Sequence, residues 1–259
     1  MEERGALGME QEVKVKSLQK ALQVLECFLG DRELGISEIA ARLGLCKSSV
    51  HNIVSTFEAM DYLQQNLQTS RYSLGVKLCE YSRAVSRNFS VTKIALPYMQ
   101  EIANQVREHV YLGRPYRDEV LYLESIHPIE NLEMMRSLMG VRVKMYCTGL
   151  GKALLAYLPP ETLEASLQTP LERYTENTIT DPERLRSELE TVRRQGYAVD
   201  DMEHEYGIKC VGVPIFNRNR QVCAAISVSG PSLRFSPERI VTLAAMLKEA
   251  ARKIQQNIY

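Results

Sequence analysis

Between residues 47 and 55 the chain carries short polar side chains of the types that can read the edges of DNA base pairs. An apolar residue recurs there at helical spacing, at Val50, Ile53, Val54 and Phe57. The opposite helix face then presents groups that can hydrogen-bond to base edges and phosphates in a major groove. The side chains that we expect on this DNA-contacting face are Lys47, Ser48, Ser49, His51, Asn52 and Ser55.

A second group of polar atoms is expected in the C-terminal half. Gly149-Leu150-Gly151-Lys152 follows a strand and opens a helix, and the amides of a helix N-terminus favour an anionic group. Ser227 and Ser229 stand two residues apart on a strand, so both hydroxyls project from one face of the sheet. These features fit a site for a small organic acid, although the glycine spacing alone fits a tight strand-to-helix turn equally well.

Cysteine and histidine chemistry supplies two alternatives. A cysteine-dependent enzyme would use Cys210 or Cys147 as nucleophile, His204 or His127 as base and Asp200 to orient the base. A metal- or thiol-responsive regulator would use His204, Glu205, Cys210 and Cys147. The six cysteines form no C-x-x-C pair and no local catalytic signature occurs, so we expect reduced thiols, no enzymatic activity, no metal and no cofactor.

The DNA-contacting face must be positioned by a small helical domain. An apolar stripe of Leu18, Ala21, Leu22, Leu25, Phe28 and Leu29 predicts a first helix. A second, shorter stripe of Ile36, Ile39, Ala40 and Leu43 predicts a second helix, with Ser37 as N-cap and Gly44 as its C-terminal stop. A helix-turn-helix needs a small residue at the helix crossing, a left-handed turn and a buried branched residue, which Ala40, Gly44 and Val50 supply.

A wing is expected directly after these helices. Residues 62–65 and 71–74 alternate in polarity around a polar turn, which predicts a hairpin that brings Arg71 near the phosphates. From Leu18 to Leu74 there are five basic and six acidic residues, a weak electrostatic footprint for DNA. A winged helix that contacts another protein therefore stays open as an alternative.

Beyond residue 75 the pattern predicts linker helices and then an α+β domain with an antiparallel sheet. Helical periodicity runs from Gly75 to about Val106 in two pieces, the second beginning at Leu96-Pro97 because proline is tolerated in a first turn. The expected strands are 109–113, 120–126, 132–137, 144–147, 197–200, 210–216 and 222–229. The expected helices are 150–157, 160–167, 182–195 and 237–256, the last two capped by Asp181 and Ser236.

Composition limits the partners. The 259 residues include 32 Lys and Arg against 32 Asp and Glu, and 45% are apolar, as in ordinary globular proteins. Net charge of zero gives no global argument for nucleic acid, so the DNA hypothesis depends on the local motif. No apolar run approaches the roughly 18 residues of a membrane span, and the first dozen residues lack a signal-like segment, so we expect a cytoplasmic protein without a membrane partner.

Three stretches resemble the IclR family of bacterial transcriptional regulators. They are SLQKALQVLECF with ISEIAARLGLCKSSVHNIVSTFEAMDYL, then CTGLGKALLAYLP, and finally GYAVDDMEHEYGIKCVGVPIFNRNRQVCAAISVSGP. The resemblance implies a winged helix-turn-helix domain, a GAF-like effector domain, and a dimer or tetramer acting on promoter DNA, more often as a repressor. The expected divisions are a disordered arm at 1–13, a DNA-binding domain at 14–75, a linker helix at 76–89 and an effector-binding domain at 90–259.

The resemblance also implies an effector pocket, formed by residues from several segments that match the family's pocket positions. These residues are Leu132, Met135, Val143, Gly149, Leu150, Asp200, Ile208, Cys210, Ser227 and Ser229. Two positions depart from the family pattern. Asn52 stands where an arginine is usual in the recognition helix, which changes the expected operator sequence. Met202 stands where an acidic residue is common, which makes a metal site near Asp200 less favourable.

Overall fold

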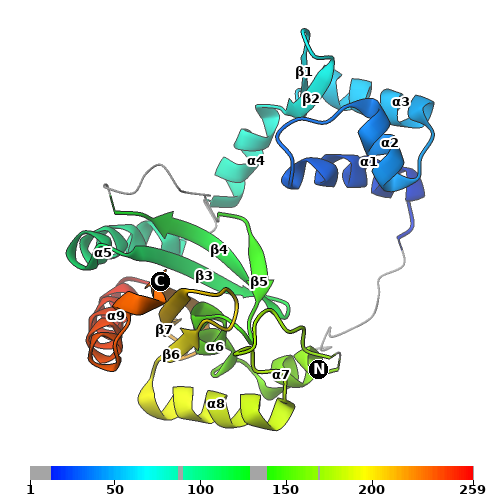
Figure 1. Ribbon diagram of the computed structural model, residues 1–259. Coiled ribbons are helices and arrows are strands. Elements are labelled where there is room, and N and C mark those ends of the chain that lie inside the picture. The colour runs from blue at the N-terminus through cyan, green and yellow to red at the C-terminus, as the bar shows by residue number, and fades with distance from the viewer. Residues whose placement is uncertain (1–12, 87–89, 129–138, 169, 259) are drawn as a thin grey trace, which may run out of the picture. The chain divides into compact units, whose positions relative to one another are not determined.

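The computed structural model describes residues 13–86, 90–128, 139–168 and 170–258 (Figure 1). The chain folds as two compact units, residues 1–88 and 89–259. The expected arm at 1–13 lies outside the described residues except for Val13, and the expected strand at 132–137 lies outside them completely. No helix in the described ranges is both long and apolar enough to cross a membrane.

The N-terminal unit begins with three helices. They are α1 (Lys16–Glu26), continued by the short 3-10 turn η1 (Cys27–Leu29), then α2 (Ile36–Leu43) and α3 (Lys47–Ala59). Gly44 adopts the left-handed conformation with φ of 63° that the α2–α3 turn requires, as predicted. The expected N-cap was wrong, because α2 is capped at Gly35, whose N–H donates to Glu38 Oε2 at 2.7 Å, and Ser37 lies inside the helix.

Side chains from all three helices and the hairpin form the core of this unit. The buried residues are Val24, Phe28, Leu34, Ile39, Ala40, Val50, Val54, Leu63 and Tyr72. The stripe predicted for the first helix is only partly buried, because Leu18, Leu22 and Leu29 remain 57%, 49% and 78% exposed. The helix therefore packs on the core through Val24 and Phe28 and leaves a second apolar face uncovered.

The predicted hairpin is present as β1 (Leu63–Asn66) and β2 (Arg71–Leu74), an antiparallel pair with Leu63 opposite Leu74. Leu34 forms a further bridge to Tyr72 in β2, which fixes the hairpin to the segment before α2. This arrangement of three helices and a two-stranded wing is a winged helix-turn-helix.

Two helices follow the wing, α4 (Lys77–Ser86) and α5 (Ser90–Val106). The predicted start at Leu96-Pro97 was wrong, because α5 already begins at Ser90 and Pro97 lies inside it. Ala95, Met99, Ile102 and Ala103 form one buried stripe along α5 on the C-terminal core. Burial on both sides of Pro97 compensates for the backbone hydrogen bond that proline removes.

Within the described residues, the C-terminal unit is built on six antiparallel strands in the order β5-β4-β3-β8-β7-β6. The strands are β3 (His109–Tyr116), β4 (Glu119–Ile126), β5 (Arg142–Lys144), β6 (Ala198–Asp201), β7 (Ile208–Phe216) and β8 (Val222–Pro231). The expected strand 144–147 is displaced, because pairing with β4 ends at Lys144 and the next residues turn into a helix. The α+β class with an antiparallel sheet is confirmed.

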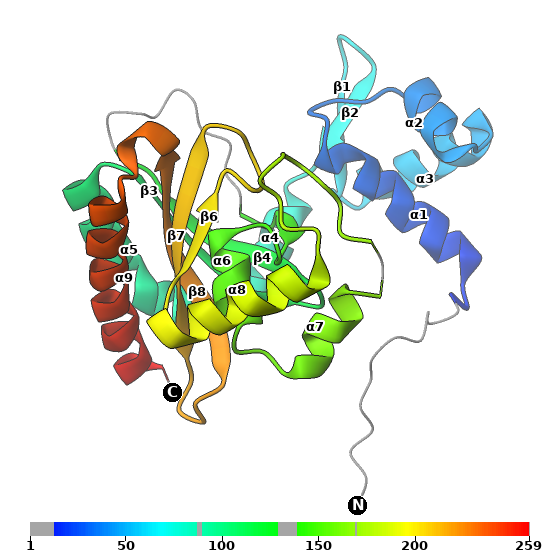
Figure 2. The ribbon, with the colours of Figure 1, turned by 60° about the horizontal axis from the view of Figure 1, so that its bottom comes forward.

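Helices cover both faces of this sheet. One face carries α5 and α9 (Pro237–Asn257), and the other carries α6 (Gly149–Leu155), α7 (Pro160–Ser166) and α8 (Pro182–Gln195), as Figure 2 shows. Both predicted N-caps are confirmed, because Asp181 accepts a hydrogen bond from the Arg184 amide and Ser236 from the Arg239 amide. The sheet thus separates two cores, and α6 packs directly against β7.

Glycines permit the close approach of α6 to β7. A Cβ on Gly212 would lie 2.2 Å from the Gly149 carbonyl oxygen, and one on Gly149 would lie 3.1 Å from Cys210 Cβ. Gly151 would meet the Met145 backbone in the same way, at 2.2 Å. Gly149 and Gly212 are therefore required for the packing of α6 on β7, and Gly151 for the turn that leads from β5 into α6.

We expect Gly212→Ala to destabilise the C-terminal unit by about 1 to 3 kcal/mol, because its methyl group overlaps the α6 backbone. Guanidinium unfolding followed by circular dichroism measures this loss. Gly30→Ala is the matched control, since its Cβ would meet no atom within 4 Å and its φ of −104° suits any residue. Equal stability of the two variants would show that α6 and β7 do not meet in this way.

Candidate DNA interface and ligand site

The structure places most of the predicted DNA-contacting side chains on the outer face of α3. Lys47, Ser48, Ser49, His51 and Asn52 are exposed, and Val50 and Val54 on the opposite side are fully buried. The remaining member, Ser55, is half-buried. The first turn of α3 is therefore the most accessible part of this helix, as in helices that enter a major groove by their N-terminal residues.

Cys46 occupies the N-cap position of α3 and was not predicted as part of the DNA-contacting face. Its Sγ lies 3.0 Å from Ser49 Oγ and 3.4 Å from Ser48 Oγ. These hydroxyls stabilise the thiolate, Ser48 most, and lower the pKa of the exposed Cys46 thiol to about 7. The predicted face thus contains a partly ionised sulfur beside its serines.

Arg71 is engaged within its own domain. Its guanidinium lies 2.8 Å from Glu38 Oε2 and donates to the Glu33 carbonyl at 3.1 Å. The Gly35 amide, followed by Arg71, lowers the pKa of the Glu38 carboxyl. Arg71 therefore ties the wing to α2, and a phosphate would have to share a guanidinium that Glu38 already partly neutralises.

In the C-terminal unit, strand register brings the predicted ligand residues to one face of the sheet. Ser229 is opposite Cys210 and Ser227 is opposite Gly212, while Cys210 is in turn opposite Asp200. Directly paired residues share a face. The helix that covers this face is α6, whose first residue, Gly149, lies against Cys210. These residues come together below the start of α6.

Hydrogen bonds connect this polar set. The Cys210 thiol donates to Ser229 Oγ at 3.0 Å, and Asp200 Oδ1 accepts the Glu203 N–H at 2.7 Å. Burial raises the pKa of Asp200 to about 7, opposed by the Glu203 amide, and raises the pKa of the Cys210 thiol well above its usual range. Near neutral pH Asp200 can therefore either accept or donate a hydrogen bond, and Cys210 stays a thiol.

Sequence reasoning missed Tyr111, Tyr122 and His109 on the same face, and named His127 only as a candidate catalytic base. Tyr111 is opposite Ser227 and His109 is opposite Ser229, and His109 Nδ1 lies 3.0 Å from His127 Nδ1. Tyr122 packs edge-on to Tyr111, with ring centroids 5.5 Å apart. The alternation of HVYLG in β3 was the available signal, since every second residue of a strand shares a face.

Burial sets the protonation of these groups. Burial is the largest cause of the lowered pKa of both His109 and His127. The nearby His127 lowers the pKa of His109 further. Burial raises the pKa of Tyr111 to about 12 and raises that of Tyr122 further. At neutral pH the cluster thus offers uncharged hydrogen-bonding groups, of which the two imidazoles can gain a charge beside an anion.

The first turn of α6 is less open to an anion than its sequence suggests. Thr148 Oγ1 already accepts the Gly151 N–H at 3.0 Å, so helix geometry leaves the amides of Gly149 and Leu150. The Leu150 side chain is fully buried and packs beside Gly113 of β3. The helix N-terminus can contribute at most a part of an acid-binding site.

Lys152, on the next turn of α6, is a buried cation. Its Nζ donates to Glu203 Oε1 at 2.5 Å and to Glu188 Oε1 at 2.9 Å, and its side chain is 1% exposed. Burial raises the pKa of Glu203, opposed by Lys152, while the two glutamates keep the pKa of Lys152 raised against the effect of its own burial. Because the Glu203 amide holds Asp200, this ion cluster positions the carboxyl of the candidate site.

The other predicted pocket residues are placed less directly. Val143, in β5, pairs with Val120 of β4 and packs on the same core as α6. Ile208 is the first residue of β7 and lies on the same face as Cys210. Leu132 and Met135 lie outside the described residues. Their place in the pocket stays a prediction.

The side chains named for the catalytic and metal alternatives are not brought together in the arrangements that those alternatives need. His204 packs on Tyr174, with ring centroids 5.2 Å apart, and His127 contacts His109 rather than a thiol. Burial raises the pKa of Cys147 to about 12, so it stays protonated. Within the described part of the chain, no three His, Cys, Asp or Glu side chains are grouped so that they could hold a metal ion.

A winged helix-turn-helix with an exposed polar recognition face, attached to an α+β domain with a buried polar site, defines a DNA-binding transcriptional regulator. The family model for the IclR helix-turn-helix domain matches residues 17–67, and that for the IclR C-terminal domain of bacterial transcriptional regulators matches residues 83–256. The chain belongs to the IclR family. Its relatives are regulators and not enzymes, so the cysteine-dependent enzyme alternative is set aside.

Full-length relatives support this assignment. The chain is 36% identical to the regulator KdgR of Escherichia coli K12 over 94% of this chain and 93% of that protein. It is 35% identical to KipR of Bacillus subtilis 168, over 95% and 98%.

Solved structures agree with the fold. Thermotoga maritima IclR is 33% identical, with TM-score 0.79, over 94% of this chain and 98% of that one. An IclR homologue from Microbacterium hydrocarbonoxydans, complexed with 4-hydroxybenzoate, is 30% identical with TM-score 0.82, over 93% and 98%. A small carboxylic acid is thus bound by one protein of this family.

Proposed function

We propose that this chain is a cytoplasmic repressor whose binding to promoter DNA is modulated by a small organic acid held in the C-terminal unit. The observation that carries the second half of the proposal is the convergence of Asp200, Cys210, Ser227 and Ser229 on one buried face below α6. Buried polar groups that converge in this way favour a polar ligand over an empty core.

On the DNA side, the first turn of α3 enters the major groove and the wing lies over the backbone. Lys47 contacts a phosphate, to which its compact ammonium charge is attracted. Ser48, Ser49 and His51 supply further hydrogen bonds, with Ser55 at the edge of the contact. Asn52 reads an adenine edge, for which a side-chain amide has matching donor and acceptor groups. Arg71, on the wing, lies near the phosphates of the DNA backbone.

We expect Asn52→Ala to weaken binding to the cognate duplex by about 1 to 3 kcal/mol and to change binding to unrelated duplexes little. The duplex is obtained by selection from genomic fragments with the purified chain, and affinities are measured by fluorescence anisotropy. Lys47→Ala is the matched control on the same face, expected to weaken all duplexes alike and to reduce the salt dependence. If Asn52→Ala weakened cognate and random DNA equally, Asn52 would not read a base.

In the ligand site, we propose that hydroxyl and carboxylate groups of the acid occupy opposite ends. Ser227 and Ser229 donate to the carboxylate, with the Gly149 and Leu150 amides beside it. Asp200 accepts from a ligand hydroxyl, and lies away from the carboxylate because two like charges repel. Val143 and Ile208, with Leu132 and Met135, are proposed for the apolar wall.

Replacement of the site hydroxyls should weaken binding of the acid without disturbing the rest of the protein. A panel of hydroxylated and aromatic carboxylates, including 4-hydroxybenzoate, is first screened for acids that raise the melting temperature of the wild type. We expect such an acid to bind the double variant Ser227→Ala/Ser229→Ala at least about tenfold more weakly, which is the equivalent of 1.4 kcal/mol. Calorimetry measures both affinities. Ser187→Ala, at an exposed position on α8, is a control outside the proposed contacts. An acid that binds both proteins equally would place the site elsewhere.

The obvious test of the glycine turn is unsuitable. Gly149→Leu would add volume to the proposed ligand site, but a side chain at that position would also point into Cys210 and the β7 backbone. It would disturb the packing of α6 before it excluded a ligand. The serine pair removes hydrogen bonds without adding volume, and is therefore the informative change.

Self-association completes the proposal. A single recognition helix reads only a few base pairs, so a dimer or tetramer on a pseudo-palindromic duplex is expected. The linker segment around α4 offers exposed apolar side chains for pairing, since Val76 is 71% and Val85 51% exposed. An acid that favours one arrangement of paired linkers would then change the spacing of the recognition helices.

A further inference from the structure

A row of polar side chains crosses the sheet on the face below α6. Ser229 of β8 lies between His109 of β3 and Cys210 of β7. At one end of the row, His127, the residue after β4, contacts His109. At the other end, Asp200 of β6 lies opposite Cys210. Because neighbouring strands are about 4.8 Å apart, an acid bound at Ser229 lies one strand away from His109 and two strands away from Asp200.

The groups of this row favour one orientation of a hydroxy acid. The Ser229 hydroxyl accepts a hydrogen bond from the Cys210 thiol at 3.0 Å, so its own hydrogen is left to donate to a carboxylate. Asp200 repels a carboxylate whenever it is ionised, whereas the imidazole of His109 is either neutral or positive. The carboxylate of the acid therefore lies on the histidine side of Ser229.

His109 and His127 form a pair that can take up one proton. Their Nδ1 atoms are 3.0 Å apart, so one carries a hydrogen and donates it to the other. One added proton keeps this hydrogen bond and turns one ring into an imidazolium. A second proton would place a hydrogen on both Nδ1 atoms and bring two like charges together. Within the described ranges neither Nε2 atom has a hydrogen-bond partner, so each is left for a ligand.

The charged groups around the pair keep it neutral in the absence of an anion. Burial lowers the pKa of His109, and His127 and then Arg234 lower it further. Arg234, in the 3-10 turn η3 (Ser232–Arg234), is itself held by Glu108 at 2.6 Å. Burial also lowers the pKa of His127, and Glu124 opposes this effect only in part. An anion beside His109 reverses the balance, because an opposite charge favours the imidazolium.

Of the other titratable groups on this face, Asp200 is the one that competes for a proton near neutral pH. Tyr111 Oη lies 3.3 Å from His109 Nδ1, and burial keeps the phenol protonated by raising its pKa to about 12. Burial likewise raises the pKa of Cys210 well above its usual range. The pKa of Asp200 is raised by burial to about 7, so a test must separate this carboxyl from the histidines.

We propose that the acid is bound together with one proton, which the His109–His127 pair takes up beside the ligand carboxylate, a step that rests on the function proposed above. The imidazolium donates an N–H to the carboxylate in a charge-assisted hydrogen bond. Binding is therefore tighter at lower pH, and the regulator responds to the acid and to acidity together.

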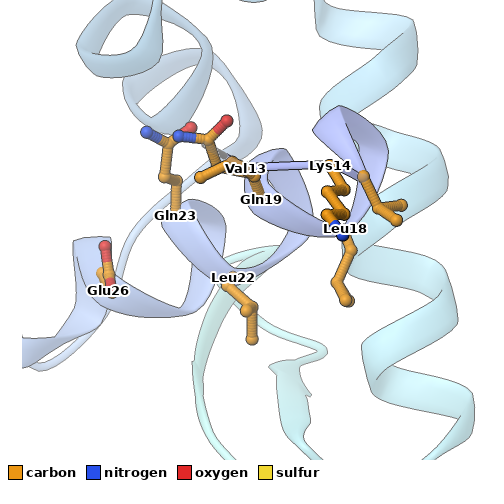
Figure 3. Close-up of a pocket in the computed structure, with 8 residues that line it drawn as sticks. Val13, Lys14, Leu18, Gln19, Leu22, Gln23 and Glu26 are labelled. Carbon is orange, nitrogen blue, oxygen red and sulfur yellow. The ribbon is translucent and has the colours of Figure 1, made fainter. Parts of the chain in front are cut away.

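An exposed anion site behaves differently, which makes the proton a marker for the buried face. Figure 3 shows a shallow groove along α1 that is lined by Leu18 and Leu22, with Lys14 beside them. Lys14 is exposed, and a lysine carries its positive charge at neutral pH with or without an acid. An acid held at such a surface takes up no proton.

Calorimetry of the full chain counts the protons. The acid that stabilises the wild type in the melting screen is titrated at pH 6.5 in two buffers whose enthalpies of ionisation differ widely. We expect an uptake of about 0.5 to 1 proton per site, and a Kd about tenfold lower at pH 6 than at pH 8. The carboxylate of the ligand is ionised throughout this range, so it does not contribute.

His109→Gln should abolish the uptake. The amide still forms hydrogen bonds but takes no proton, so the proton count should fall to about zero while the Kd at pH 8 changes less than about twofold. His204→Gln is the matched control, because this half-buried imidazole packs on Tyr174, and it should retain the uptake. Asp200→Asn should retain the uptake as well, whatever its affinity for the acid.

The outcomes distinguish this proton from the acid site itself. No acid binding at all would overturn both proposals, whereas binding without proton uptake between pH 6 and pH 8 would overturn this one alone. So would uptake that is kept in His109→Gln, or lost in His204→Gln or Asp200→Asn. If His109→Gln folds poorly, the wild type decides: NMR of the ring nitrogens of its four ¹⁵N-labelled histidines should show one imidazolium gained when the acid is added, and no gain would contradict the proposal.

Discussion

Lys152→Met is expected to lower the free energy of unfolding of the C-terminal unit by about 3 to 5 kcal/mol, because it leaves a buried carboxylate without its counter-charge. Lys152 Nζ contacts both Glu203 and Glu188, and the Glu203 side chain is only 6% exposed. Methionine keeps most of the volume, so the loss is electrostatic. Guanidinium unfolding measures the change, since the transition midpoint follows stability at constant slope.

A matched surface pair separates this effect from the loss of any lysine. Lys209 lies 2.8 Å from Asp201, whose side chain is 56% exposed, and Lys209→Met should cost about 1 kcal/mol or less. Adding Glu203→Gln to Lys152→Met should recover much of the lost stability, because it removes the unpaired charge. A Lys152→Met protein within 1 kcal/mol of wild type would show that Lys152 is not buried in this cluster.

Asp200→Asn is expected to stabilise the protein above neutral pH and to have little effect near pH 4. The folded-state pKa of Asp200 is raised by burial from 3.8 to about 7, so ionisation is less favourable in the folded chain than in the unfolded one. The protonated carboxyl therefore gives its full stability below pH 3.8. This stability is lost as the pH rises through about 7.

The magnitude follows from linkage. A pKa raised from 3.8 to about 7 corresponds to roughly 4 kcal/mol between the low-pH and high-pH limits. Asparagine can still accept the Glu203 N–H, so the difference between wild type and variant isolates the charge. Unfolding curves at several pH values measure it. A difference that is constant with pH would mean that Asp200 titrates normally and is not buried.

Local signals predicted the elements of the fold well where a single residue dictates a conformation. Gly44 provides the left-handed turn between α2 and α3, and Asp181 and Ser236 cap α8 and α9. The errors arose where tertiary packing outweighs such signals. Pro97 lies within α5 because the buried stripe continues past it. The N-cap of α2 is Gly35, whose N–H is bound by Glu38, and not Ser37.

The candidate site was partly predictable for a similar reason. Alternation on β8 placed Ser227 and Ser229 on one face, and strand register then brought Cys210 and Asp200 to them. Register between strands distant in sequence is not encoded locally, so Tyr111 and His109 were not recognised as neighbours of the serines. The close helix–sheet packing of Gly149 and the buried ion pairs of Lys152 likewise depend on contacts that no short motif specifies.

The central claim is that an acid bound below α6 changes the affinity for DNA, and reciprocity tests it most directly. The Kd of the full chain for its selected duplex is measured with and without the acid that stabilises it, and the Kd for that acid with and without duplex. Thermodynamic linkage requires the same factor in both directions, expected to be about 5- to 150-fold. A factor of one in both, with the acid bound and the DNA bound, would contradict the proposed control of DNA binding by this site.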